Sequence, residues 1–225
     1  NWIPAKIDTL TALIENQKRR IVRNSDEFLA VVLEALDELN KALVSESLPR
    51  AIDLWNECKV NSVTKYRPKD ENRVSDYVTR FLRSYLIERG IVINREVQIR
   101  RDNKRQFADI HLTAVEDSAS SMSSKIELVI EVKGNWHPQI DEAMKRQLLD
   151  QYMKKNSINI GIYLVSWFNY ENWDREDPRR SDALRKNENK KQALEKYNEQ
   201  ARRLSDNTFK VKPYVLDISL GGSQD

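Results

Sequence analysis

The stretch Leu128–Gly134, LVIEVKG, joins an apolar run to one glutamate and one lysine, and it decides the predicted fold. Its branched apolar residues favour a β-strand, and a mostly apolar strand is typical of the centre of a sheet. Alternate residues of a strand share a face, so Glu131 and Lys133 project together while Ile130 and Val132 face the other way. Two charged side chains near the end of a buried strand predict a cleft at that end of the sheet.

A second strand, QFADIHL at 106–112, carries another acid in its middle. Alternation gives this strand a polar face and a core-like face. The two faces consist of Phe107, Asp109 and His111, and of Ala108, Ile110 and Leu112. Pairing with LVIEVKG as an antiparallel hairpin would bring Asp109 beside Glu131. Two carboxylates this close repel unless a cation lies between them, and Mg²⁺ prefers hard oxygen ligands. Lys133 would then orient a water molecule or stabilise charge on a phosphate.

The rest of the pattern predicts an α/β fold in which helices flank a mixed central sheet. The expected order is helix, three strands, helix, strand, helix, strand. These elements are a helix from Glu71 to a C-cap at Gly90, strands at 91–101, 106–115 and 125–134, a helix at 137–155, a strand at 158–168, a charged helical segment at 179–204 and a strand at 209–219. We expect a turn at 102–105 and a serine-rich hairpin loop at 117–124.

The first sixty residues predict helices without catalytic spacing. Apolar residues recur every three or four positions across 25–43, where Ser25 or Asp26 is a suitable N-cap, and helical patterns also cover 10–15 and 48–59. We interpret these helices as packing or coupling elements. The predicted organisation is therefore a helical N-terminal segment at 1–62 followed by an α/β domain at 63–225.

The composition of the chain narrows the class of protein. Its 225 residues are 32% charged with a formal net charge of +3, which leaves room for basic patches that face an anionic partner. The single cysteine, Cys58, has no partner for an internal disulfide, which favours a reducing cytoplasmic setting. No apolar stretch approaches the roughly 18 residues of a membrane span, so no membrane association is expected. The chain begins with Asn, which suggests a piece of a longer polypeptide.

Asp109, the spacer and Glu131-Val132-Lys133 resemble the PD-(D/E)XK nuclease superfamily. The resemblance covers about Tyr66 to Phe168. It implies a restriction-endonuclease-like fold and Mg²⁺-dependent cleavage of phosphodiester bonds, with Mn²⁺ able to substitute. Ala108 stands where the name-giving proline would be, at the position that varies most in the superfamily. Under this resemblance residues 63–225 form the nuclease domain, and DNA rather than RNA is the expected substrate.

The resemblance also assigns residues outside the signature. Glu71 resembles the additional helix carboxylate of the superfamily, and 146–152, RQLLDQY, resembles its glutamine-bearing helix, with Gln147 expected to face the site. Gln151 and Tyr152 are the alternatives on that helix. In the implied mechanism Glu71 joins the other two acids in holding one or two metal ions, with the backbone carbonyl of Val132 as a further ligand. Lys133 positions the attacking water, and Gln147 supports Lys133 or a phosphate oxygen.

Other interpretations stay open at this point. The domain could be a catalytically inactive nucleic-acid-binding or interaction domain of the same fold, or the effector end of a bacterial antiviral defence protein. In the second case the N-terminal helices would form a homodimer or larger assembly. Glu71 also suits the first turn of a helix, where an acid complements the helix dipole. His111 and His137 are interpreted as structural, and 179–204 as either a solvated helix or a wall that follows a phosphate backbone.

Overall fold

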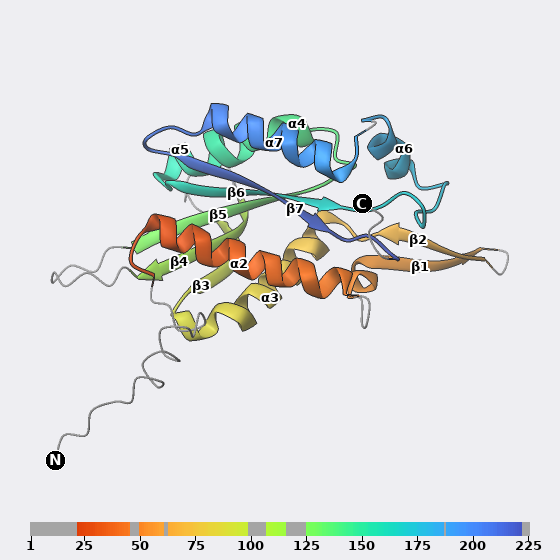
Figure 1. The fold of residues 1–225 in the computed structure, drawn as a ribbon, viewed down its shortest axis with the longest axis horizontal. Coiled ribbons are helices and arrows are strands. Elements are labelled where there is room, and N and C mark those ends of the chain that lie inside the picture. Colours follow the sequence, from red (N-terminus) through yellow and green to blue (C-terminus); the bar gives the residue numbers. More distant parts are fainter. Residues whose placement is uncertain are drawn as a thin grey trace, which may run out of the picture.

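The computed structural model describes residues 22–45, 50–60, 63–98, 107–115, 125–186 and 188–221. A five-stranded sheet lies between two layers of helices (Figure 1). The strands, in their order across the sheet, are β3 (Val92–Gln98), β4 (Phe107–Val115), β5 (Lys125–Gly134), β6 (Ile160–Trp167) and β7 (Lys210–Asp217). All five lie close to the ranges predicted from the sequence.

The sheet is mixed, as the sequence predicts. β3, β4 and β5 pair antiparallel, whereas β5, β6 and β7 pair parallel. Parallel neighbours need a crossover, and helices supply it between β5 and β6 and again between β6 and β7. The α/β class with a helix-flanked mixed sheet is thereby confirmed. β5 is the central strand and switches the sheet from antiparallel to parallel pairing.

Helices cover both faces of the sheet, which explains why β6 is buried throughout and β5 is buried over most of its length. One layer contains α2 (Ser25–Val44) and α3 (Glu71–Leu86), and the other contains α4 (Ile140–Ala143), the π-helical η4 (Met144–Met153), α5 (Lys154–Asn156) and α7 (Lys190–Leu204), with α6 (Pro178–Leu184) beyond the end of β6. Ile130 and Val132 belong to the core cluster on the α2 and α3 side. Val129, Tyr163 and Val165 belong to the cluster on the η4 and α7 side.

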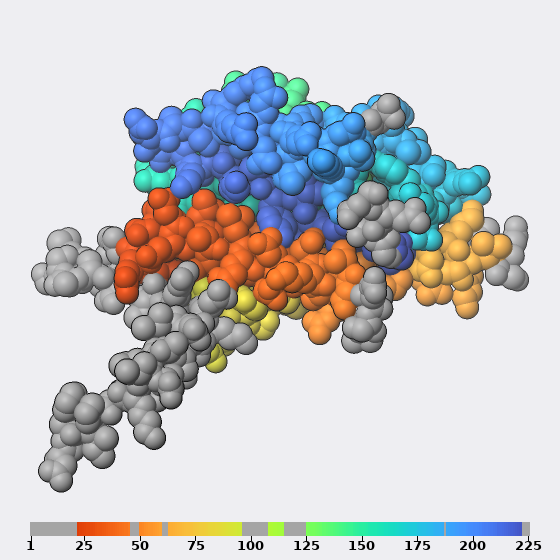
Figure 2. Space-filling view, viewed as in Figure 1, coloured from red at the N-terminus to blue at the C-terminus, as the bar shows by residue number. Residues whose placement is uncertain are grey.

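The predicted helix at 25–43 is confirmed, but its N-cap is Asn24 rather than Ser25 or Asp26. The Asn24 side chain accepts a hydrogen bond from the backbone N–H of Glu27, in the usual capping geometry. The apolar side of α2 lies in the same core cluster as the sheet, and the surface of α2 runs along β7 (Figure 2). The division of the chain at residue 62 stays a prediction.

The helix predicted at 48–59 is wrong. A four-residue 3₁₀ helix, η2 (Ala51–Leu54), leads into β1 (Trp55–Val60), which pairs antiparallel with β2 (Val63–Pro68). Trp55 packs edge-on against Phe168, and its indole N–H donates a hydrogen bond to the carbonyl oxygen of Ile218, 2.8 Å away. These long-range contacts outweigh the local helical pattern.

The two later helical regions are more divided than predicted. The helix expected at 137–155 consists of α4, η4 and α5, and the segment expected at 179–204 forms the separate helices α6 and α7. α3 begins at Glu71, and a 3₁₀ turn, η3 (Ile87–Arg89), leads to Gly90 in the left-handed region at φ 66°. The helical pattern at 10–15, the turn at 102–105 and the loop at 117–124 lie outside the described residues.

Candidate functional site

Four charged side chains from three elements converge at the carboxyl end of β5. β5 supplies Glu131 and Lys133, β4 supplies Asp109, and the first residue of α3 is Glu71. The Lys133 ammonium lies 2.5 Å from Oε1 of Glu131 and 3.8 Å from Oε2 of Glu71. The sequence therefore predicts correctly that Asp109, Glu131 and Lys133 share one end of the sheet, and α3 adds the carboxylate of Glu71.

The site forms where β4 and β5 separate. Their ladder ends at the pair Ile110 and Ile130, one residue short of an Asp109 to Glu131 pair. Backbone N–H groups two residues apart on a strand point to the same edge, so those of Val132 and Gly134 are left without a β4 partner.

Carboxylates take the place of the missing ladder. Oδ2 of Asp109 accepts a hydrogen bond of 2.8 Å from the N–H of Val132, and Oε1 of Glu71 accepts one of 2.8 Å from the N–H of Gly134. Two of the three acids are thus fixed by the backbone of β5 itself.

The separation of the strands also changes where Ala108 packs. Ala108 belongs to the core cluster on the η4 side, whereas Ile110 and Leu112 belong to the opposite cluster. The prediction that these three residues share one face is wrong at Ala108, because strict alternation does not continue past the point where β4 leaves β5.

Burial makes this cluster electrostatically costly. Glu131 is 2% exposed and Lys133 6%. Burial, and next the charge of Asp109, raise the pKa of Glu131 to about 8. Burial raises the pKa of Asp109 and of Glu71 as well, against the opposing effects of their backbone hydrogen bonds and of the Lys133 charge. Burial on its own lowers the pKa of Lys133, but Glu131 and Glu71 outweigh it and raise that pKa.

The oxygens of the cluster fit a hard divalent cation. Oε2 of Glu131 is buried without a hydrogen-bond partner, and Asp109 and Glu71 add carboxylate oxygens at the same strand end. The carbonyl oxygen of Val132 faces the same region, because it lies 3.3 Å from the Lys133 ammonium. Within the described ranges, no three His, Cys, Asp or Glu side chains already stand in a metal-binding arrangement. In this arrangement the ammonium of Lys133 is the counter-ion of the carboxylates.

Comparison with known proteins places the chain in a family. Residues 29–170 match the family model described as a domain of unknown function, DUF8371. The chain belongs to this family. The matched region of this DUF8371 chain contains all four cluster residues and η4, and it ends before α6, α7 and β7. No curated protein matches the chain. No solved structure matches it.

Gln147 is the predicted site residue that the structure joins least clearly to the cluster. It lies on η4, which covers the same face of the sheet, and its Oε1 atom is buried without a partner. Among the described residues no hydrogen bond links Gln147 to the four cluster residues. For Tyr152, an alternative on the same helix, the charges of Glu131 and Asp109 add to burial in raising the pKa of the phenol, which links its ring electrostatically to the cluster.

The two histidines lie apart from the carboxylates, in line with structural roles. Nε2 of His111 lies 3.0 Å from Oε1 of Glu127, four residues before Glu131 on β5. Nδ1 of His137 accepts a hydrogen bond from the N–H of Gln139 in the loop after β5. Neither histidine bonds to a cluster acid in the described part of the chain.

Arg95 is a residue that the sequence pattern does not reveal. Its guanidinium donates to the carbonyl oxygens of Asp109 and Asn72 and to the carboxylate of Asp76, at 2.9, 3.1 and 2.8 Å. It therefore ties β3 and α3 to the part of β4 that carries Asp109. The sequence does not reveal this role of Arg95, because its contacts depend on how α3 lies against the sheet.

A methyl group at Gly134 should disturb the site. A Cβ atom there would lie 2.5 Å from Cζ2 of Trp136, so the backbone or the indole must move. We expect Gly134→Ala to lower the free energy of unfolding by about 1–3 kcal/mol, as overpacking does, and to misplace Glu71. Chemical denaturation tests this. The cost of Gly134→Ala should be smaller in a Trp136→Leu background than in the parent chain, because the clash with the indole is then absent. An unchanged unfolding midpoint in Gly134→Ala would contradict the prediction.

Proposed function

We propose that this chain is a metal-dependent nuclease that hydrolyses phosphodiester bonds, with a restriction-endonuclease-like fold. The observation that carries the proposal is the convergence of three carboxylates and one ammonium at the open end of the central strand. DNA is the substrate we favour, by the resemblance of Asp109 and Glu131-Val132-Lys133 to the PD-(D/E)XK superfamily.

The charge balance of the cluster supports a functional role. A structural ion pair would oppose one acid to one base, whereas here the ammonium of Lys133 pairs with both Glu131 and Glu71, and its charge also acts on Asp109. Removing charges from water is costly, and excess buried carboxylates repel one another. Such an arrangement lowers the stability of the fold, and strongly perturbed pKa values of this kind concentrate at functional sites.

Each cluster residue has a role that its contacts allow. The Lys133 ammonium, held by Glu131, can donate to a water molecule or to a phosphate oxygen and offset negative charge as the bond breaks. The N–H of Val132 fixes Asp109 and the N–H of Gly134 fixes Glu71, so both carboxylates are oriented before substrate binds. Tyr152 and Gln147 on η4 are candidates to support Lys133 or a phosphate oxygen.

Asp109, Glu131 and Glu71 are the residues that would hold Mg²⁺ or Mn²⁺, with the carbonyl oxygen of Val132 as a further ligand. A bound divalent cation supplies charge neutralisation at the phosphate and a more acidic water.

The proposal predicts cleavage that needs both a divalent cation and Asp109. Plasmid, single-stranded DNA and RNA should each be incubated with Mg²⁺, with Mn²⁺ and with EDTA. We expect EDTA to abolish cleavage and Asp109→Asn to reduce it about 100-fold or more, as loss of a key catalytic group does. Asp150→Asn, which removes an exposed carboxylate paired with Lys154, is the matched control and should cleave like the parent chain.

The outcome decides between an enzyme and a binding domain. If the chain binds nucleic acid but gives no product with either metal, the inactive interaction domain is the correct interpretation. The cytoplasmic setting, the role in antiviral defence and assembly through the N-terminal helices stay predictions. In the described residues no helix combines the length and apolarity that crossing a bilayer requires.

A further inference from the structure

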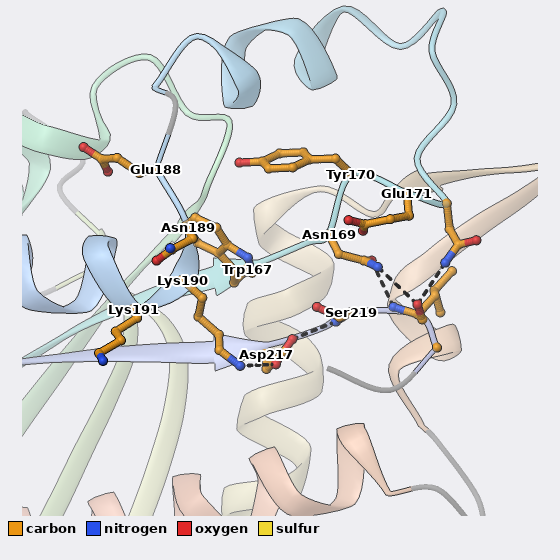
Figure 3. Close-up of a pocket in the computed structure, with 13 residues that line it drawn as sticks. Trp167, Asn169, Tyr170, Glu171, Glu188, Asn189, Lys190, Lys191, Asp217 and Ser219 are labelled. Carbon is orange, nitrogen blue, oxygen red and sulfur yellow. Dashed lines mark hydrogen bonds and ion pairs between the residues drawn. The ribbon is translucent and has the colours of Figure 1, made fainter. Parts of the chain in front are cut away.

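A cavity of about 800 Å³ is lined by thirteen residues, none of which belongs to the proposed catalytic cluster (Figure 3). It opens at the carboxyl ends of the parallel strands β6 and β7, the end of an open α/β sheet where ligands commonly bind. Its lining includes Trp167 at the end of β6, Tyr170 just after it, and Asp217 at the end of β7.

The cavity and the cluster share one face of the sheet. Glu131 pairs in register with Tyr163, so alternation along β6 puts Trp167 on the same side as Glu131 and Lys133. Trp167 in turn pairs with Asp217. Strands lie roughly 5 Å apart, so β7 is about 10 Å from β5 across the sheet. A nucleic acid whose phosphate is bound at the cluster could therefore place a neighbouring nucleotide in the cavity.

The walls of the cavity are rigid and partly aromatic. Tyr170 stacks on Trp173 at an interplanar angle of 15° and meets Trp167 edge-on at 65°. Asn169 holds the far wall with two hydrogen bonds, from its amide to the Leu220 carbonyl oxygen at 3.1 Å and from the Leu220 N–H to its Oδ1 at 3.0 Å. The cavity is therefore largely preformed.

Charge in the cavity is close to balanced and leaves no excess of cations for a phosphate. Three carboxylates line it, those of Glu171, Glu188 and Asp217, against the two ammonium groups of Lys190 and Lys191, and Glu188 is paired with the Lys196 ammonium at 2.7 Å. The Lys190 ammonium is engaged by Asp217 at 2.6 Å (Figure 3). The occupant should be neutral rather than anionic.

The polar groups of the cavity that make no hydrogen bond suit a flat heterocycle. Within the described part of the chain, the Trp167 indole N–H and the Glu171 carboxylate make no hydrogen bond. One donor and one acceptor beside aromatic rings match the edge and the faces of a nucleobase.

We propose that this cavity binds one unstacked nucleobase of the strand whose phosphate lies at Glu131 and Lys133. The inference rests on the proposed nuclease function, and it narrows the substrate to single-stranded or locally unpaired nucleic acid, because a base inside a duplex is not free to enter.

The test compares a strand that has bases with one that lacks them. Binding of dT8 and of an abasic strand of equal length and charge is measured by fluorescence anisotropy in EDTA, which prevents metal-dependent cleavage. We expect the parent chain to bind dT8 about tenfold more tightly, a modest value for base stacking on aromatic rings. Ser219→Trp, which fills the cavity with a ring, should remove this preference, and so should Glu171→Trp, which places a ring at a second lining position.

Thr208→Trp is the matched control, because Thr208 is exposed in the turn before β7, at the opposite end of that strand. It should keep the preference for dT8. A parent chain without the preference, or a preference that survives both cavity variants, overturns the inference even if metal-dependent cleavage is found. A preference that both cavity variants abolish supports the base site even if no cleavage occurs, in which case the nuclease function alone fails.

Discussion

Lys133→Met should nearly abolish cleavage and destabilise the metal-free protein. The substitution keeps the aliphatic stem but removes the ammonium that faces Glu131 and Glu71. We expect the rate of metal-dependent cleavage to fall about 100- to 1,000-fold, since loss of one preorganised charge-stabilising group has an effect of that size. We also expect the free energy of unfolding to fall by about 3 kcal/mol at pH 9, where Glu131 is ionised, because removing one partner strands the other buried charges.

The two effects are measured separately. Single-turnover cleavage at saturating Mg²⁺ reports the chemical step, and urea denaturation in EDTA reports stability. Lys65→Met is the matched control, because Lys65 also contacts two carboxylates, Asp174 at 3.1 Å and Glu176 at 3.3 Å, and neither of them belongs to the cluster. It should leave the cleavage rate unchanged. A Lys133→Met chain that cleaves at the parent rate would remove Lys133 from the mechanism.

Glu131→Gln should abolish cleavage and yet make the metal-free protein more stable at high pH. Glu131 has a folded-state pKa of about 8, above its ordinary value of 4.5, so the folded state binds the proton more tightly. Between these two values the folded chain keeps the proton and the unfolded chain releases it, so stability falls as pH rises. The introduced amide would resemble the protonated acid, with an oxygen for Lys133 and an NH₂ group for Asp109.

The expected gain is on the order of 3 kcal/mol at pH 9 and small at pH 5. Three other ionisable groups face Glu131. The pKa values of Asp109 and Glu71 are also raised, and Lys133 stays charged from pH 5 to pH 9 because its pKa is raised as well. Denaturation in EDTA from pH 5 to pH 9 measures the difference between parent and variant. Glu142→Gln, which removes an exposed partner of Arg146, should give curves parallel to the parent. Parallel curves for Glu131→Gln would refute the prediction.

Local pattern predicted the parts of the molecule that depend on strand periodicity. Glu131 and Lys133 share a face because both belong to one uninterrupted strand, and Asp109 reaches them because the antiparallel partner is adjacent in the chain. Alternation failed at Ala108, where β4 leaves β5 so that the carboxylate of Asp109, rather than its backbone, bonds to Val132. The departure from a regular ladder is itself what forms the site.

Features fixed by distant contacts could not be predicted in this way. Trp55 lies in a strand because its ring is buried against residues more than a hundred positions away, whereas its own neighbours have a helical pattern. Arg95 reaches the site only through the placement of α3, and the cavity at Trp167 needs the end of β7, the last strand among the described residues. None of these long-range contacts produces a periodic pattern of residues that could be recognised in the sequence.

The position of α2 has a consequence for self-association. β7 is the last strand of the described sheet, and an uncovered outer strand invites pairing with another molecule. Here Asn40 of α2 accepts from the N–H of Asp217, Asp37 accepts from the hydroxyl of Tyr214, and Pro213 lacks an N–H to offer. We expect these features to disfavour intermolecular strand addition at this border, so that copies of the chain that meet do so without extending the sheet past β7.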